Sequence, residues 1–142
     1  MNVRIELDTN PGEAERNAIL QPLRAFNIAN AGSTVPETFA LLVRDEQTDA
    51  IIGGLYGKLF YRWMFIELLV VPEQTRGQGT GSRLMEMAEA HARAKDCVGI
   101  WLDTFSFQAP AFYQRHGYTE FGHIDDYPPT HTRHFFQKRL HP

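Results

Sequence analysis

The sequence has a single cysteine, Cys97, so no disulfide can form within the chain. It has no apolar run that approaches the roughly 20 residues needed to cross a bilayer, and no signal-peptide pattern opens it. It also lacks a basic surplus, because 14 lysines and arginines stand against 17 aspartates and glutamates. These absences argue against a disulfide scaffold, a membrane protein and a general nucleic-acid binder. The simplest expectation is a cytoplasmic protein with neither nucleic acid nor membrane as a partner.

What the sequence does contain is an ordinary globular composition. Hydrophobic residues make up 43% and charged residues 22% of the 142 residues. This length and composition suit one compact domain with a core of normal size. Because no repeat, low-complexity tract or linker-like change in composition divides the chain, the sequence predicts a single domain over residues 1–142.

Hydrophobic periodicity and turn residues predict an alternation of strands and helices. A first strand is expected at residues 2–7, followed by a helix over residues 10–30 with Asn10 as its cap and Pro22 kinking or dividing it. Three later strands joined by short polar turns should form an antiparallel meander, with bulges at the glycines of the middle one. The later strands are expected at residues 39–45, 50–61, 64–71, 98–107, 118–124 and 131–140, and the later helices at about 80–95 and 109–117.

A glycine-rich turn separates the strand at 64–71 from the helix at 80–95. The turn reads RGQGTGS over residues 76–82 and has glycine at alternate positions. Glycines let backbone N–H groups point into one concavity, and the start of a helix adds a partial positive charge there. Arg76 adds a formal charge, so the turn is suited to bind a diphosphate. The strands before and after this helix should be parallel neighbours through a right-handed crossover, in a sheet that is otherwise antiparallel.

Two common phosphate-binding motifs do not fit this turn. A P-loop needs a lysine after its last glycine, where this sequence has Ser82. A dinucleotide fingerprint needs G-x-G-x-x-G, which neither Gly77 nor Gly79 starts, although Asp103 ends the next strand as the ribose-binding acid of that fold would. The pattern that does fit is R-x-x-G-x-G, over residues 76–81.

Two segments resemble the motifs of the GNAT superfamily, the acyl-CoA-dependent N-acyltransferases. LLVVPEQTRGQGTGSRLM (68–85) is similar to the acyl-CoA-binding motif, and FSFQAPAFYQRHGY (105–118) is similar to the second motif, N-x-x-A-x-x-x-Y. The two stand in the family's order, separated by one helix and one strand, and the resemblance in element order covers nearly the whole chain. It implies an α/β fold with a mixed, mostly antiparallel central sheet, one splayed parallel strand pair and flanking helices.

The resemblance implies acetyl-CoA as a co-substrate and indicates which residues would bind it. Pantetheine would enter the splayed gap like another strand and meet backbone groups of residues 69–71. N–H groups of the turn would hold the diphosphate, helped by Arg76 and Gln78. The family often has asparagine where this sequence has Ser106, whose hydroxyl offers fewer hydrogen bonds than an amide. The implied coenzyme-binding residues are Leu69, Val70, Val71, Arg76, Gly77, Gln78, Gly79, Thr80, Gly81, Ser82, Ser106, Ala109 and Phe112.

Acyl transfer to an amine needs a base and an acid. A protonated amine with a pKa near ~10 cannot attack a thioester, and a departing thiolate, with a thiol pKa near ~8.5, benefits from a proton. Tyr113 occupies the family's usual acid position, and Glu67, the only ionisable residue in MFIELLVV, is the candidate base. A core aromatic and a solvent-facing glutamate are their structural alternatives. No metal site is expected, because no cysteine or carboxylate cluster joins the H-x-x-H at 131–134.

The expected function is direct transfer of an acetyl group from acetyl-CoA to a primary amine, of a small molecule or a peptide, in a ternary complex. A non-catalytic acyl-CoA-binding regulatory module is the alternative, and a nucleotide-binding domain is a third possibility. Glu67, placed at the strand end nearest the glycine turn, Asp103, Asp125 and Asp126 could surround the acyl end and favour cationic acceptors over α-amino acids. Carboxylates that only face solvent would discriminate nothing. The resemblance also makes a homodimer plausible.

Overall fold

The computed structural model describes residues 1–141, and the chain separates into two compact units, Met1–Val35 and the part from Pro36 onward. The first unit contains one helix, α1 (Glu13–Ala31). No strand forms in residues 1–8, so the expectation of a strand at residues 2–7 is wrong. A strand needs a neighbour for its backbone hydrogen bonds, and none of the six strands of the sheet pairs with this segment.

Helix α1 differs from its expected form at its start. The cap residue is Gly12 rather than Asn10, and the Gly12 N–H donates to Glu15 Oε1 at 3.2 Å. The helix continues through Pro22 without dividing. A proline removes one N–H from the helical ladder, and the remaining bonds on either side carry this helix across it.

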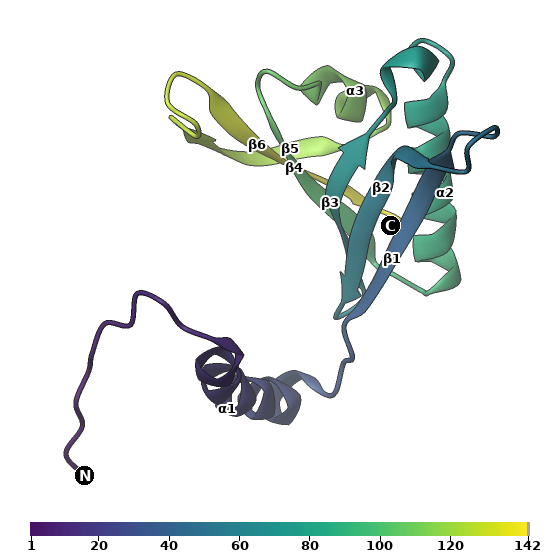
Figure 1. Cartoon of the computed structure of the whole chain (residues 1–142). Coiled ribbons are helices and arrows are strands. Elements are labelled where there is room, and N and C mark those ends of the chain that lie inside the picture. Colours follow the sequence, from purple (N-terminus) through teal and green to yellow (C-terminus); the bar gives the residue numbers. More distant parts are fainter. Residues whose placement is uncertain (142) are drawn as a thin grey trace. The chain divides into compact units, whose positions relative to one another are not determined.

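The second unit is built on a six-stranded mixed sheet with the order β1-β2-β3-β4-β6-β5 (Figure 1). All neighbouring strands are antiparallel except β3 and β4, which are parallel. Each boundary lies within two residues of its expected position, and the mixed sheet with one parallel pair is confirmed. The strands are β1 (Glu37–Arg44), β2 (Ile51–Phe60), β3 (Trp63–Val70), β4 (Gly99–Phe105), β5 (Thr119–Asp125) and β6 (Thr132–Arg139).

Three helical segments complete this unit: the short 3-10 helix η1 (Glu73–Thr75), α2 (Thr80–Ala94) and α3 (Pro110–Arg115). Helix α2 joins the two parallel strands and covers one face of the sheet (Figure 1). Its buried residues are Gly81, Leu84, Met85, Ala88 and Ala92, whereas Met87 is exposed. Within residues 1–141, no helix has the length and apolar content needed to cross a membrane.

The parallel pairing of β3 with β4 stops halfway along the strands. The last paired residues are Ile66 and Leu102. On its other side, β3 has a β-bulge against β2 in which Glu67 is the extra residue, beside Gly57. A Cβ at Gly57 would lie 2.6 Å from a carbonyl oxygen of β3, so only glycine permits this approach. A bulge bends its strand, which accounts for the fork that opens between β3 and β4.

Candidate active site

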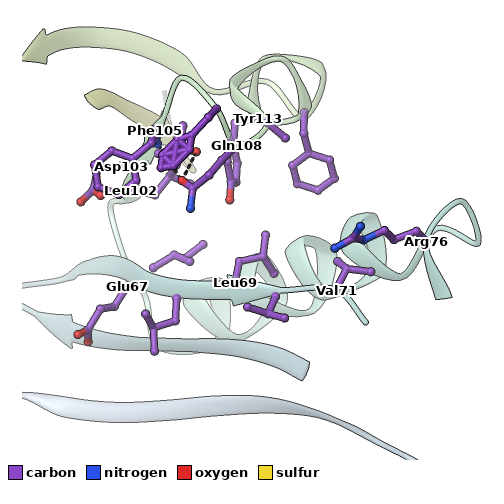
Figure 2. Close-up of a pocket in the computed structure, with 16 residues that line it drawn as sticks. Glu67, Leu69, Val71, Arg76, Leu102, Asp103, Phe105, Gln108 and Tyr113 are labelled. Atoms are coloured by element: carbon purple, nitrogen blue, oxygen red, sulfur yellow. Dashed lines mark hydrogen bonds between the residues drawn. The ribbon is translucent and has the colours of Figure 1, made fainter. Parts of the chain in front are cut away.

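The fork between β3 and β4 is a cleft of about 700 Å³ (Figure 2). Beyond Ile66 and Leu102 the two strands continue without pairing to each other, so the backbone of β3 faces the cleft on this side. Helix α3 and the loop before it form the opposite wall. The cleft is lined by residues 66–71, 102–105 and 107–109, together with Arg76, Phe112 and Tyr113. The splayed parallel pair that the sequence resemblance implies is thus present.

The cleft brings together about half of the residues expected at the site. Those that line it are Glu67, Leu69, Val70, Val71, Arg76, Ala109, Phe112 and Tyr113. The other expected residues, Ser106 and the turn from Gly77 to Ser82, are not among the residues that line it. Arg76 therefore joins the cleft to the glycine-rich turn.

The three glycines of the turn are needed for different reasons. Gly77 and Gly79 have φ angles of 80° and 79°, in the left-handed region that favours glycine, and a Cβ on either would meet nothing within 4 Å. Gly81 is buried, and a Cβ there would lie 3.2 Å from the ring of Phe112 on α3. The first bond of helix α2 runs from the N–H of Arg83 to the carbonyl of Gly79. The N–H groups of the first turn are left as an anion-binding end.

Gln78 is engaged within the turn itself. Its backbone N–H donates to the carbonyl of Thr75 at 3.2 Å, and its side-chain Nε2 donates to the carbonyl of Gln74 at 3.3 Å. Gln78, Gly79 and Thr80 border a second hollow of about 580 Å³ beside α2 and β1. Arg76 is not among the residues that line this second hollow.

Tyr113 extends from α3 toward the cleft (Figure 2). Only 8% of the residue is exposed, and its ring lies edge-on to that of Phe112, with centroids 5.1 Å apart. Burial, and secondarily the charge of Asp103, raise the pKa of Tyr113 to about 12. The tyrosine is thus both a core aromatic and a protonated hydroxyl at the cleft wall at neutral pH.

Two carboxylates follow the last paired residues of the fork. Glu67 and Asp103 are each one position beyond the Ile66–Leu102 pair and both line the cleft. In Figure 2 both residues lie toward the end of the cleft away from Arg76, with the Glu67 side chain on the opposite side of β3 from Asp103. Glu67 is thus at the fork in mid-strand, and the expectation that it lies at the strand end nearest the turn is wrong. Its side chain is exposed.

The other two acidic residues that were expected near the acyl end do not line the cleft. Asp125 is the last residue of β5, and its carboxylate lies 3.8 Å from His123 Nε2. Asp126 follows it, is exposed, and accepts a hydrogen bond from the N–H of Thr130. The predicted acidic rim is therefore reduced to Glu67 and Asp103, because the end of β5 lies outside the set of residues that form the cleft.

Gln108 lines the cleft and was not expected from the sequence. Its Oε1 accepts hydrogen bonds from Thr104 Oγ1 at 2.9 Å and from the N–H of Phe105 at 2.8 Å (Figure 2). A backbone N–H can only donate, so the amide oxygen must face it, and Nε2 with its two N–H donors is left for the cleft. Ser106 Oγ instead accepts from the N–H of Thr132 at 3.1 Å. The sequence signal that could have identified Gln108 was a side-chain amide only two positions after Ser106.

Comparison with known proteins identifies the family. A model described as the acetyltransferase (GNAT) family matches residues 6–118. The chain belongs to this family. It is 37% identical to acetyltransferase Atu2258 of Agrobacterium fabrum, over 82% of this chain and 84% of the relative. It is 40% identical to blasticidin-S acetyltransferase of Streptomyces morookaense, over 89% and 91%. A crystal structure of an acetyltransferase from Bacillus cereus ATCC 14579 matches with a TM-score of 0.84 at 36% identity, covering 95% of this chain and 98% of that one.

Membership in the GNAT family makes this chain an acyltransferase enzyme. The family match includes the fork, the glycine-rich turn and all of α3. The resemblance drawn from the two sequence motifs is confirmed, as is the mixed sheet that it implied.

Proposed function

We propose that this GNAT enzyme transfers an acetyl group from acetyl-CoA directly to a primary amine of a small molecule. The observation that carries the proposal is the fork itself, a cleft with a cationic Arg76 at one end, carboxylates at the other and the buried Tyr113 in its wall. The relative named for blasticidin-S supports a small-molecule acceptor rather than a peptide.

The coenzyme site that we propose has a backbone part and a side-chain part. Backbone groups of Leu69, Val70 and Val71 on the cleft-facing edge of β3 bind the pantetheine amides, since beyond Ile66 this edge makes no ladder to β4, whereas the other edge pairs with β2. The diphosphate binds at the amino end of α2, where free N–H groups and Arg76 provide positive potential. Gly77, Gly79, Thr80, Gly81 and Ser82 supply this N–H set, whereas the N–H of Gln78 is used within the turn.

Gln108 compensates for the serine at position 106. The hydroxyl of Ser106 is tied to the start of β6, so it is a poor candidate for the pantetheine contact that the family resemblance implied. The Gln108 amide has its oxygen fixed by Thr104 and Phe105 and keeps two donors for the cleft. We therefore assign the amide contact with pantetheine to Gln108, with Ala109 and Phe112 beside it.

In the reaction, the amine nitrogen attacks the thioester carbonyl carbon, the new N–C bond forms and the C–S bond breaks. Glu67 takes the proton that the nitrogen loses, directly or through water. A backbone N–H near Leu69 or Val70 meets the oxyanion. Tyr113, whose pKa of about 12 lies above the ~8.5 of a thiol, donates a hydrogen bond to the departing sulfur. The proton taken by Glu67 then passes to solvent and the thiolate takes one proton from solvent, so the protons balance and the products are the acetylated amine and coenzyme A.

The wider setting of the enzyme is also part of the proposal. We expect one functional domain over residues 1–142, a cytoplasmic location consistent with a single cysteine, and no nucleic-acid partner at a net charge of −3. A homodimer is in keeping with the family.

The test is release of free coenzyme A thiol from acetyl-CoA in the presence of polyamines, amino acids, aminoglycosides and peptides. Calorimetry measures acetyl-CoA binding in parallel. We expect acetyl-CoA to bind and at least one small-molecule amine to be acetylated. Binding without turnover across the panel would favour the non-catalytic acyl-CoA-binding module, and binding of a nucleotide that lacks the pantetheine arm would favour a nucleotide-binding domain.

A further inference from the structure

Arg133 on β6 is held in a box of aromatic rings next to the cleft. Its guanidinium carbon lies 5.6 Å from the ring centroid of Phe105, 4.8 Å from that of Tyr127 and 5.4 Å from that of Phe135. Rings on several sides restrict the rotamers of a long side chain, and cation–π attraction favours the charge among them. The guanidinium is thus a fixed charge rather than a mobile surface group.

The fixed guanidinium holds one carboxylate of the cleft. Arg133 Nη2 lies 2.8 Å from Asp103 Oδ2, and the two side chains are 25% and 15% exposed. Asp103 lines the cleft immediately after Leu102, the last residue of β4 that pairs with β3. Its charge contributes to the raised pKa of Tyr113, so the carboxylate lies within electrostatic reach of that hydroxyl. Asp103 is therefore a preoriented anion close to the group that we assign to the departing sulfur.

A carboxylate has about four lone-pair sites, and the ion pair with Arg133 engages Oδ2. Asp103 keeps the capacity to accept further N–H donors from the cleft. A carboxylate that bound only the reacting nitrogen would stabilise its protonated form, which cannot attack the thioester. A second cationic group on the acceptor would keep its charge from the bound complex to the transition state, so binding it does not oppose the reaction.

We propose that Asp103 is a specificity-determining residue that binds a second cationic group of the acceptor, and that Arg133 is the residue that positions it. The preferred substrates are then amines that carry another ammonium or guanidinium group. The proposal rests on the proposed acetyltransferase function and adds the acceptor class to it. Glu67 at the same end of the cleft reinforces the negative potential there.

The experiment compares 1,4-diaminobutane with n-butylamine, which have the same carbon chain and differ by one amine. We expect kcat/KM for the diamine to exceed that for the monoamine at least tenfold in the parent enzyme. In Asp103→Asn this ratio should fall to about one, mainly through a higher KM for the diamine. Asp126→Asn, which changes an exposed carboxylate outside the cleft, is the matched control and should retain the ratio.

Arg133→Gln tests the positioning role, with the melting temperature measured alongside. We expect its ratio to fall toward that of Asp103→Asn, and Arg133→Lys to recover part of it. A parent enzyme that acetylates both amines equally well, or an Asp103→Asn variant that keeps the preference, would overturn this inference while leaving the acetyltransferase proposal intact. Failure of every amine to release thiol, with acetyl-CoA bound, would overturn both.

Discussion

At the scale of single residues, the hydroxyl of Tyr113 is the group whose removal tests the chemistry most directly. Tyr113→Phe keeps the ring packing and removes the hydrogen-bond donor at the cleft wall. We expect kcat to fall roughly 10²-fold and acetyl-CoA affinity to stay within about twofold. Tyr118→Phe is a suitable control, because it removes a second buried hydroxyl, which donates to Glu89. Thiol release and calorimetry give the two quantities, and equal kcat in Tyr113→Phe and the parent would return Tyr113 to a purely structural role.

The same two tyrosines predict how stability depends on alkaline pH. Burial, as the main cause in each case, raises the pKa of Tyr113 to about 12 and that of Tyr118 well above its usual value of about 10. The protonated hydroxyls favour the folded state. This contribution is complete below pH about 10, the unfolded pKa, and is lost as pH rises through the folded pKa of Tyr113. Urea unfolding should show the free energy of unfolding falling above pH 10, by about 1–3 kcal/mol from Tyr113 and in the same direction from Tyr118.

Each phenylalanine variant should remove part of this alkaline loss. We expect the slope of unfolding free energy against pH above 10 to be shallower in Tyr113→Phe and Tyr118→Phe than in the parent. An unchanged slope in both would mean that other groups cause the alkaline loss of stability.

At the scale of elements, the glycine-rich turn before α2 is the feature that we expect to be most sensitive to substitution. Gly79 is the cap of α2 and has a φ of 79°, so a valine there would strain the backbone and cover the amino end of the helix. We expect Gly79→Val to weaken acetyl-CoA binding at least tenfold, about 1.4 kcal/mol. Gly122→Val, at an open position on β5, is the matched control. Normal acetyl-CoA binding by Gly79→Val in calorimetry would show that this turn does not hold the diphosphate.

Most elements of the second unit were predictable because their signals are local. Alternating apolar residues marked the strands, and the glycine turn marked the start of α2 at Thr80. The segment at 2–7 also alternates, but alternation describes only one strand and does not provide the neighbour that it needs. A local pattern therefore predicts which segments can be strands, whereas pairing decides which of them are.

Site residues that belong to a sequence motif could be predicted. Residues whose position depends on how the strands pair could not. Arg76 and Tyr113 came from motifs, and both line the cleft. Glu67 was expected near the end of its strand because nothing in the sequence shows that the bulge beside Gly57 adds its extra residue to β3. Arg133 reaches Asp103 only because β6 lies antiparallel beside β4. Such a pair joins residues 30 positions apart in the chain, and one sequence carries no signal for it.

At the scale of the molecule, the cleft is polarised although the whole chain has a net charge of only −3. Figure 2 shows Glu67 and Asp103 toward the end of the cleft away from Arg76. An anionic coenzyme and a cationic acceptor can then occupy the two ends without competing for the same charge. The fork creates this separation, because it holds β3 and β4 apart over the length of the cleft.

Separate binding ends predict additive effects of substitutions at the two ends. Arg76→Gln should raise the Kd for acetyl-CoA, and Asp103→Asn should raise the KM for 1,4-diaminobutane. Each change in kcat/KM is converted to a change in activation free energy. The value for the double variant should equal the sum of the two single-variant values within about 0.5 kcal/mol, as for sites with no shared partner. Arg115→Gln, which changes an exposed arginine of α3 outside the cleft, should alter neither constant. A coupling larger than about 1 kcal/mol would mean that Arg76 and Asp103 act on the same bound group, and the division into a coenzyme end and an acceptor end would be wrong.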